Sequence, residues 1–487
     1  MKFHSVALNM HDHNTYDGVT HYQVERHTRA KHNLNYDNPH DPNPSRHFFD
    51  TYVKSDDKKL CFTVSNLGQE FVIDKIEAKF GKDFLNFRPN HIWDCYHTDD
   101  FYYIDHHQSH ATYALLSSKF DESDVLAIDG RGWQFNCIFV DKHGNIKDLT
   151  DKLSIGGLWN RLSQDLGFGY LGAGKVMGLA GYGKYNYQIH AMLDYYLNND
   201  NKLPDWYKQV LDKSTKEDVA FTLQYVTEYL IKKYVYPLKT SDNLCVAGGV
   251  AYNGYMNEEF TKHYKNVHIP PAVGDEGQAI GTYMHAEYVV NGNIHIPCVY
   301  AGVDHEYTLP DIFEDLDIPK IAQQIADGKI VGWYQGRSES GNRALGNRSI
   351  LADPRNPDIK NIINSTIKMR EDFRPFAPSV LEEHYNKFFD TTQPSPYMSR
   401  IVKVKGDVVP GVTHVDGTAR IQTVNRQQNQ KFYDLINEFY KITGVPMLLN
   451  TSFNSQEPIV ETPHEAYETY ERTALDILVI DNKVIKK

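Results

Sequence analysis

Three predicted strand ends in the first half of the chain carry clustered glycines. They are AIDGRG (127–132), KVMGLAGYG (175–183) and VAGGVAYNG (246–254). Glycine lets the backbone approach a bound group without a Cβ in the way, and a helix that opens after such a turn directs N–H groups at an anion. Strand and helix patterns alternate around these turns. Any one such turn is common, but the three together indicate an α/β fold that binds a nucleotide.

The same alternation continues along the chain from about residue 51. Residues 125–146 predict two strands joined by glycine turns, 218–238 an amphipathic helix, and 475–487 a closing pair of strands. The acidic, proline-containing stretch 300–317 marks a boundary. No repeat with a period of about 20–50 residues is visible. We therefore expect two α/β domains, 1–305 and 318–487.

The charge of the chain is uneven. The net charge of −12 argues against broad binding to nucleic acid. Residues 337–374 nevertheless hold eight Lys/Arg and five Asp/Glu, which makes this segment +3. Arginines in turns that also contain Gly, Pro and Ser are suited to bidentate phosphate binding, although salt bridges to Glu339, Asp353 and Glu371 are the alternative. A basic cluster in an acidic protein predicts a discrete anionic ligand.

Cysteine usage and hydropathy limit where the protein works. Its five cysteines are scattered and form no C-x-x-C pair, which favours reduced thiols in the cytoplasm and excludes a zinc-thiolate site. No run of 18 apolar residues is present, and the N-terminus lacks the apolar stretch of a signal peptide. We expect a cytoplasmic protein that does not span a membrane.

Three histidines stand close together in IDHHQSHAT (104–112). His106 and His110 are four residues apart, so a helix would place both on one face, whereas His107 would point elsewhere. With Asp129 and Asp275, each in a glycine-bearing turn, they would form a site of two histidines and two carboxylates. Such a set suits iron(II), manganese or another borderline divalent ion, although Asp before Gly is also a common turn residue.

Ten segments in order along nearly the whole chain resemble the O-carbamoyltransferase family that acts on nodulation factors, cephem antibiotics and aminoglycosides (the NodU, CmcH and TobZ type). The segments are LNMHD, HHQSHA, IDGRG, GKVMGLAGYG, AGGVAYN, GDEGQAIG, GRSESGNRALGNRSILADPR, KMREDFRPFAPSV, HVDGTARIQTV and NTSFN.

The resemblance implies a fold and a reaction. The first domain is similar to the actin-like (ASKHA), duplicated α/β domain of threonylcarbamoyl-adenosine synthesis proteins, and the second to a YrdC-like α/β domain. The second would form carbamoyl-adenylate from ATP and carbamoyl phosphate. The first would transfer the carbamoyl group to an acceptor hydroxyl on a sugar, an antibiotic or a hydroxymethylated nucleobase.

The resemblance also implies roles for individual residues. The iron(II) ligands would be His106, His110, Asp129 and Asp275, and Mg²⁺ would be a further cation. Nucleotide contacts would come from Gly130, Lys175, Gly248, Gly249, Val250 and Asn253. Carbamoyl phosphate and the adenylate would contact Arg343, Lys368, Arg374, Arg420, Ser452 and Asn454. The acceptor side would hold His11 and Asp12, with His11 as general base.

Two positions depart from the family pattern: Asn342 replaces a usual proline, and Ala173 replaces a frequent glutamate. They concern turn geometry and acceptor choice rather than the reaction. Two other functions remain open from sequence, namely tRNA threonylcarbamoylation and a non-catalytic actin-like ATP-binding module. The acceptor, the oligomeric state and the role of the His-rich segment 11–50 are left open, and nucleic acid enters only as a possible acceptor.

Overall fold

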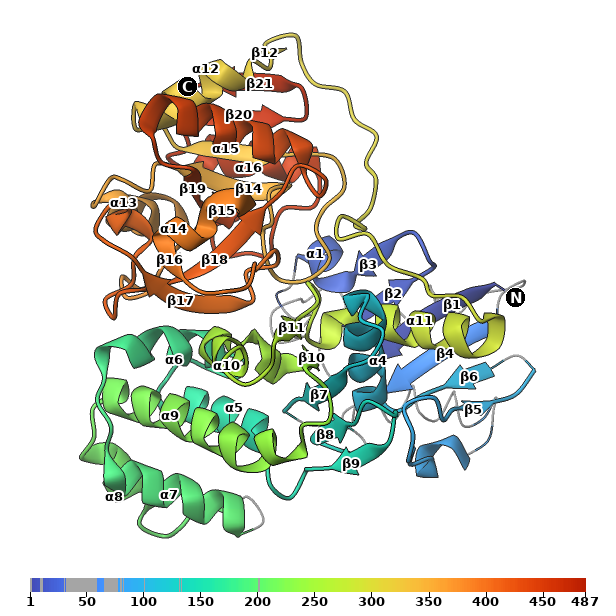
Figure 1. Cartoon of the computed structure of the whole chain (residues 1–487). Helices are drawn as coiled ribbons and strands as arrows, with labels where there is room; N and C mark the ends of the chain where they lie inside the picture. The colour runs from blue at the N-terminus through green and yellow to red at the C-terminus, as the bar shows by residue number, and fades with distance from the viewer. Residues whose placement is uncertain are drawn as a thin grey trace. The chain divides into compact units, whose positions relative to one another are not determined.

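The computed structural model divides the chain into two compact units, Met1–Cys298 and Val299–Lys487 (Figure 1). The boundary lies ahead of the 300–317 stretch because residues 299–302 hydrogen-bond within the second unit: Ser340 N donates to Val299 O, and Gly302 N to Ser338 O. The described residues are 2–8, 12–29, 31, 59–64, 78, 81, 83–99, 101–130, 132, 134–199 and 202–487. His11 and most of the His-rich segment lie outside them.

Two sheets in the first unit share one topology. One has the order β3-β2-β1-β4-β6-β5 and the other β11-β10-β7-β8-β9. In each, three consecutive strands form an antiparallel meander, a later strand (β4 or β10) pairs in parallel with its first strand, and a further strand (β6 or β11) pairs in parallel with that one. In the first sheet β5 adds antiparallel to β6. The strands are β1 (Phe3–Leu8), β2 (Asn14–Tyr16), β3 (His21–Gln23), β4 (Lys59–Val64), β5 (Tyr96–His97), β6 (Phe101–Tyr103), β7 (Asp124–Ile128), β8 (Cys137–Val140), β9 (Ile146–Asp148), β10 (Asn243–Ala247) and β11 (Asn266–His268). The fold is therefore mixed α/β with an internal duplication that no sequence repeat reveals.

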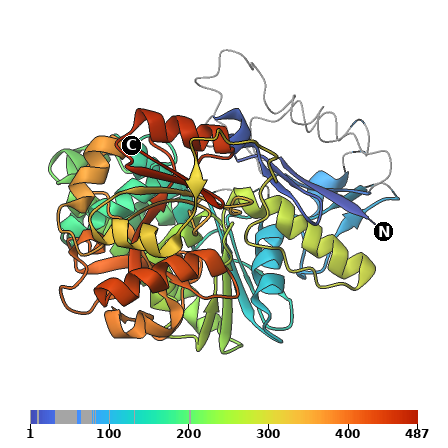
Figure 2. The same ribbon diagram turned by 90° about the horizontal axis from the view of Figure 1, so that it is seen from above.

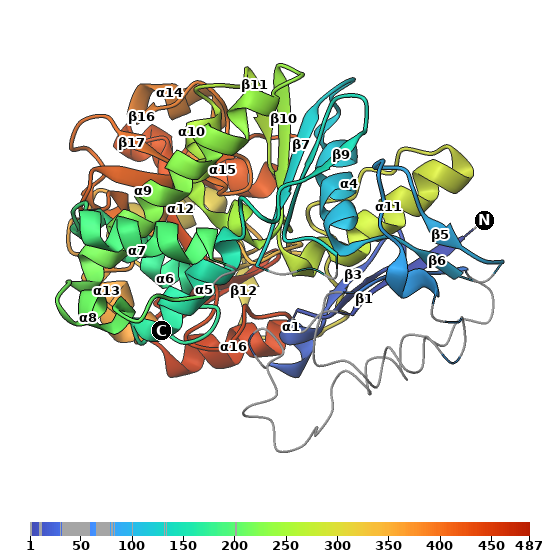
Figure 3. The same cartoon turned by 90° about the horizontal axis from the view of Figure 1, so that it is seen from below.

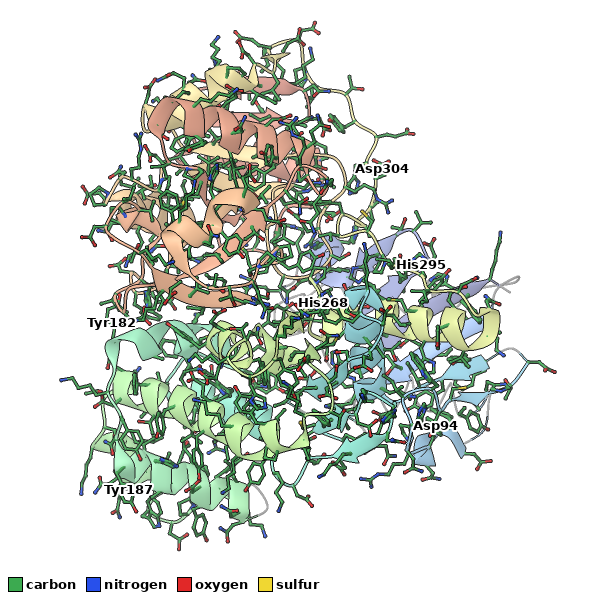
Figure 4. The ribbon with its side chains drawn as sticks, viewed as in Figure 1. Asp94, Tyr182, Tyr187, His268, His295 and Asp304 are labelled. Atoms are coloured by element: carbon green, nitrogen blue, oxygen red, sulfur yellow. The ribbon has the colours of Figure 1, made fainter. Side chains whose placement is uncertain are left out.

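Two helices lie between these sheets. Helix α4 (His106–Ser118) packs on β7 and β10, α11 (Gln278–Asn291) packs on β1 and β4, and the two helices pack on each other (Figure 3). After α11 the chain turns back on the same unit, where His295 Nε2 lies 2.7 Å from Tyr16 Oη (Figure 4). The N-terminal ends of α4 and α11 lie near the C-terminal ends of β7 and β10.

The remaining helices of the first unit lie mainly between β9 and β10 in sequence. The predicted amphipathic helix at 218–238 is confirmed as α9, and its N-cap Thr215 accepts a hydrogen bond from Asp218 N. The set is α1 (Val24–Thr28), α5 (Ile155–Asp165), α6 (Ala173–Leu179), α7 (Tyr187–Asn198), α8 (Tyr207–Asp212), α9 (Lys216–Tyr234) and α10 (Gly254–Phe260). No helix among the described residues is long and apolar enough to cross a membrane.

A single sheet of ten strands forms the second unit, in the order β12-β21-β20-β13-β14-β19-β15-β18-β17-β16. Neighbouring residues of β13 point to opposite faces: Trp333 donates to Gly346 O beside Phe432 of α15, whereas Tyr334 donates to Glu461 O before α16. Helices therefore cover both faces of this sheet (Figure 2). The predicted closing strand pair is confirmed as β20 and β21.

The elements of the second unit follow one another closely. The strands are β12 (Glu314–Asp315), β13 (Val331–Tyr334), β14 (Arg348–Ala352), β15 (Ala377–Leu381), β16 (Phe389–Asp390), β17 (Arg400–Val404), β18 (Thr418–Val424), β19 (Met447–Ser452), β20 (Ile477–Ile480) and β21 (Lys483–Lys486). The helices are α12 (Ile318–Ala326), α13 (Ile359–Ile363), α14 (Tyr385–Phe388), α15 (Gln430–Thr443) and α16 (Pro463–Arg472). A π-helical turn, η8 (Asn364–Lys368), extends α13.

Candidate functional site

Helix α4 fixes the histidine pair through its first turn. Its N-cap Asp105 accepts a hydrogen bond from His107 N at 2.8 Å, and Gln108 Oε1 accepts one from Asp105 N at 3.2 Å. This reciprocal capping box sets where the helix begins. His106 and His110 then lie on one buried face, as the four-residue spacing predicts.

Two carboxylates reach this face from distant parts of the sequence. Asp129 follows β7, and Asp275 begins the 3₁₀ turn η7 (Asp275–Gly277) that leads into α11. His110 Nε2 is 2.9 Å from Asp129 Oδ2, and His106 Nε2 is 3.3 Å from Asp275 Oδ1. One ligand atom from each of the four residues lies within 4.8 Å of all the others. The structure brings the four predicted ligands together.

The four groups hold one another in charged form in the absence of a cation. Burial lowers the pKa of His106, but the Asp275 and Asp129 carboxylates outweigh burial and raise it to about 10. They raise the pKa of His110 in the same way. Burial raises the pKa of Asp129 and Asp275, and the two imidazoles more than reverse this effect. The two imidazoles and the two carboxylates therefore favour one another's charged forms.

These residues fit a divalent metal ion. The His106 Nε2 atom is buried and makes no hydrogen bond to any described residue, although two carboxylate oxygens lie near it. A metal ion bound by both imidazoles and both carboxylates would give this nitrogen a partner. Two nitrogens and two oxygens without a thiolate suit iron(II), manganese and similar ions.

His107 lies outside this group of four. Its ring is wedged against Gly132, where an added Cβ would stand 2.5 Å from His107 Nδ1. Burial and the neighbouring His106 lower the pKa of His107 to about 3, so the ring is neutral. The separation of His107 from His106 and His110 follows from their different faces of α4.

The predicted nucleotide turn abuts the candidate metal centre. Gly248 has a φ of 94°, and a Cβ there would lie 2.2 Å from Ile128 O, so only glycine allows β10 to end this close to β7. A Cβ on Gly249 would stand 2.9 Å from Asp129 Oδ1. Gly130 N donates to the same oxygen at 2.5 Å. The glycines therefore bring backbone N–H groups beside a metal-ligating carboxylate.

Of the three other predicted nucleotide contacts, two lie at this turn. The third, Lys175, lies on a helix, so the predicted strand end at 175–183 is wrong: this stretch forms α6 and the 3₁₀ turn η4 (Ala180–Tyr182). Val250 is buried in the 3₁₀ turn η6 (Gly249–Tyr252). Asn253 caps α10 by accepting from Met256 N at 3.0 Å, and its amide donates to Gln224 Oε1 at 2.8 Å. Lys175 lies on α6, which packs against α5 and α9 rather than on the turn itself. Asn253 thus has a structural role that its sequence context did not reveal.

Asp12 lies in the left-handed conformation, with a φ of 57°, and is buried. Asn14 Nδ2 donates to Asp12 O and to Asp275 O, both at 2.8 Å, which ties the Asp12 turn to the Asp275 turn. In the sequence, nothing distinguishes Asn14 except that it lies close to His11 and Asp12. His11, the predicted general base, lies outside the described residues.

A third carboxyl group near the metal centre was missed in the sequence. Glu276 accepts hydrogen bonds from Tyr252 Oη and from Gly274 N. Burial, and then the Asp12 carboxylate, raise the pKa of Glu276 to about 7. The available sequence signal was its position directly after Asp275. Adjacency in a turn does not tell whether two side chains point the same way.

The second unit collects cationic residues at one edge of its sheet. Strand β19 runs antiparallel to β14 and β15, and β15 runs parallel to β18. The end of β19 therefore meets the starts of the other three strands. Ser452 ends β19 and Asn454 follows it; Arg343 and Arg374 precede β14 and β15, and Arg420 lies within the first half of β18. Strand pairing alone brings these five predicted residues to one edge, hereafter the cationic edge.

Lys368 completes the cationic edge from the last residue of η8. Its side chain is 2% exposed, and Nζ donates to Asn454 Oδ1 at 2.7 Å, Asn454 O at 3.0 Å and Ser452 O at 2.5 Å. All of these partners are neutral oxygens. These contacts hold the ammonium group in place at the end of β19, where a cation is suited to binding an anion.

An arginine that the sequence did not single out joins the same region. Arg370, two residues after Lys368, donates Nε–H to Asn364 Oδ1 at 2.8 Å and lies 4.6 Å from the ring centre of Phe376. Burial and then the charge of Arg374 lower the pKa of Arg370 to about 9. The Glu371 carboxylate, 3.7 Å from Arg374, offsets part of this repulsion, so the predicted salt bridge to Glu371 is present here beside the two guanidinium groups.

Other arginines of the +3 segment are structural. Arg348 is fully buried, stacks 3.6 Å above Tyr334 and donates to the carbonyls of Gln335 and Gly336. Arg355 forms the predicted salt bridge with Asp353, at 2.6 Å. Net charge therefore identified the segment but did not identify which of its arginines are available to a ligand.

Comparison with known sequences covers both units. The family model "Carbamoyltransferase N-terminus" matches residues 12–284, and "Carbamoyltransferase C-terminus" matches residues 322–487. The nodulation protein NolO of Bradyrhizobium diazoefficiens is 35% identical over 436 residues, covering 79% of each chain. Nodulation protein NolNO of Sinorhizobium fredii is 36% identical over 437 residues, 79% of this chain and 64% of that protein. The 3'-hydroxymethylcephem-O-carbamoyltransferase of Streptomyces clavuligerus is 33% identical over 304 residues, 58% of each chain.

Proposed function

The chain belongs to the carbamoyltransferase family, and we propose that it is an ATP-dependent O-carbamoyltransferase whose two units perform successive steps. As a carbamoyltransferase it is an enzyme, which sets aside the non-catalytic ATP-binding module. The actin-like assignment of the first unit and the YrdC-like assignment of the second are part of this proposal. The duplicated sheet topology supports the former.

The cationic edge carries the proposal. Lys368 is buried and donates to oxygens of Ser452 and Asn454, and Arg343, Arg374 and Arg420 lie at the same end of the sheet. Adenylation of a carbamoyl group develops negative charge on phosphate oxygens, and preorganised cations stabilise such charge. We assign carbamoyl-adenylate formation to this edge: water cleaves carbamoyl phosphate to carbamate and phosphate, and the carbamate oxygen then attacks the α-phosphorus of ATP and displaces pyrophosphate.

Transfer to the acceptor hydroxyl is assigned to the first unit. His106, His110, Asp129 and Asp275 would hold the divalent ion, iron(II) or a similar metal, which when bound supplies a Lewis acid that polarises an oxygen. Gly249, which has no Cβ beside Asp129, would leave room for the nucleotide part of the adenylate to approach the backbone there. Asp12, held by Asn14 next to the Asp275 turn, is suited to orient the acceptor hydroxyl.

The acceptor is proposed only as a class. The cephem enzyme is named for a hydroxymethyl acceptor, and its 33% identity supports a primary or sugar hydroxyl here. A hydroxymethylated nucleobase has the same reacting group. The net charge of −12 disfavours a large RNA surface and hence tRNA threonylcarbamoylation.

The proposal is tested with the full chain in two measurements. Pyrophosphate release should require both ATP and carbamoyl phosphate, and omission of either should stop it. Mass spectrometry across a panel of hydroxylated sugars, antibiotics and hydroxymethylated nucleosides should then detect the gain of one carbamoyl group. Pyrophosphate release that ignores carbamoyl phosphate, or that requires threonine and bicarbonate, would contradict the assignment.

A further inference from the structure

The turn that carries Arg343 is anchored by one fully buried carboxylate. Between β13 and β14, Glu339 Oε1 accepts hydrogen bonds from Leu345 N at 2.7 Å, Asn347 N at 2.7 Å and Arg348 N at 3.2 Å. Glu339 is 0% exposed. A carboxylate oxygen makes stronger bonds to N–H groups than a neutral oxygen does, so this one side chain gathers three donors of the same turn.

The carbonyl groups of the turn are bound by side chains from three strands. Asn450 Nδ2 of β19 donates to Ala344 O at 3.1 Å, and Gln422 Nε2 of β18 donates to Leu345 O at 2.9 Å. Trp333 Nε1 of β13 donates to Gly346 O at 2.9 Å. Residues 344–348, which follow Arg343 directly, are therefore fixed to the sheet from both sides of the backbone.

The sign of the Glu339 charge makes a direct role in anion binding unfavourable. A carboxylate facing a phosphate would repel it, whereas Oε1 of Glu339 is directed at backbone N–H groups. The acid thus holds the backbone that directly follows Arg343 and leaves anion binding to the cationic side chains.

We propose that Glu339 is a positioning residue for Arg343 in carbamoyl-adenylate formation, an inference that rests on the function proposed above for the cationic edge. An arginine side chain has about 2 kcal/mol of rotamer entropy, and an ordered backbone lowers the cost of placing its guanidinium on an anion. A displacement of about 1 Å at such a group can reduce a rate about 100-fold. Loss of the Glu339 bonds therefore acts on catalysis through Arg343.

The test is a double-mutant cycle in the full chain, read as kcat/KM for carbamoyl phosphate-dependent pyrophosphate release. Glu339→Gln keeps a side-chain acceptor of the same shape but loses the charge, and it should lower kcat/KM about 10- to 100-fold. In the Arg343→Ala background the same substitution should change kcat/KM less than about twofold. Asp353→Asn, a buried acid at the opposite end of β14, is the matched control and should leave kcat/KM unchanged.

The outcomes separate the inference from the proposed function. If Arg343→Ala reduces activity but Glu339→Gln is neutral, or if the two effects simply multiply, Glu339 has no positioning role. If Arg343→Ala itself leaves pyrophosphate release unchanged, the assignment of the cationic edge is wrong, and the inference fails with it. If Glu339→Gln does not yield folded protein, Gln422→Met, which removes the bond to Leu345 O, takes its place in the same cycle.

Discussion

The two charged regions of this enzyme are built in opposite ways. In the first unit, histidines and carboxylates of opposite charge lie in direct contact and shift one another's pKa. At the cationic edge of the second unit, cationic side chains outnumber carboxylates: Lys368 donates to carbonyl and amide oxygens, and Arg374 lies 3.7 Å from Glu371. A cation site can organise itself through its own ligands, whereas a site for anions needs a neutral framework that holds like charges together.

The largest effect should come from removing the Lys368 ammonium group at the cationic edge. Lys368→Met keeps the length of the side chain but removes the charge, and we expect carbamoyl phosphate-dependent pyrophosphate release to fall about 10³-fold. Lys360→Met, on α13 and away from Ser452 and Asn454, is the control and should retain activity. If the two regions are independent, metal content measured by elemental analysis stays the same in both variants.

Breaking the first region should have the reverse signature. Asp129→Asn removes one predicted ligand and the negative charge that lies next to His110 Nε2. Changes to groups that merely support a metal ligand cost about 10–100-fold in metal affinity, so loss of a ligand should cost about 100-fold. Iron(II) and Mn²⁺ titrations measure this effect. Undiminished metal affinity would contradict the assigned ligand set, and reduced pyrophosphate release would show that the regions are coupled.

A third prediction concerns acid stability, where the first unit contains a histidine unlike His106. His285 is buried and neutral, with Nδ1 2.6 Å from Tyr102 Oη and Nε2 2.8 Å from Ile92 O, and burial lowers its pKa to about 4. The unfolded chain binds this proton first, so stability is lost as the pH falls from about 6.5 towards 4.

For His285 the loss between pH 7 and pH 5 should be about 2 kcal/mol. Urea unfolding at a series of pH values measures it. In His285→Gln the curve should flatten by that amount over this range, although the variant is less stable at pH 7. An unchanged slope would mean that His285 is protonated in the folded protein.

The smallest effect should come from a helix cap near the cationic edge. Thr462 and Glu465 form a capping box at the start of α16, with Glu465 N donating to Thr462 Oγ1 at 3.2 Å. Thr462→Ala should lower the free energy of unfolding of the second unit by about 1 kcal/mol. Lys368 is held by other residues, so pyrophosphate release at 25 °C should not change. A large loss of activity would show that α16 supports the edge.

Much of the fold could be read from local pattern. The strand and turn sequence of residues 125–146, helix α9 and the closing pair β20–β21 all follow from spacing of apolar residues and from glycine turns. The duplication in the first unit was implied by the family resemblance alone and not by local pattern, because two sheets can share a topology without sharing any side chains. The roles of Asn253 and Arg348 were likewise hidden, since each depends on partners far along the chain.

The sequence by itself determined that His106 and His110 lie on one face, because a helix repeats every 3.6 residues and needs no tertiary information to do so. It also determined that residues 337–374 carry an excess of positive charge. Only the tertiary structure decided that Asp129 and Asp275 meet those histidines, because β7, β10 and η7 must first pair and turn at one end of a sheet. It likewise decided that Glu339 binds backbone N–H groups instead of an arginine. Its buried Oε1 accepts three hydrogen bonds from one turn, and these offset the cost of removing that oxygen from water.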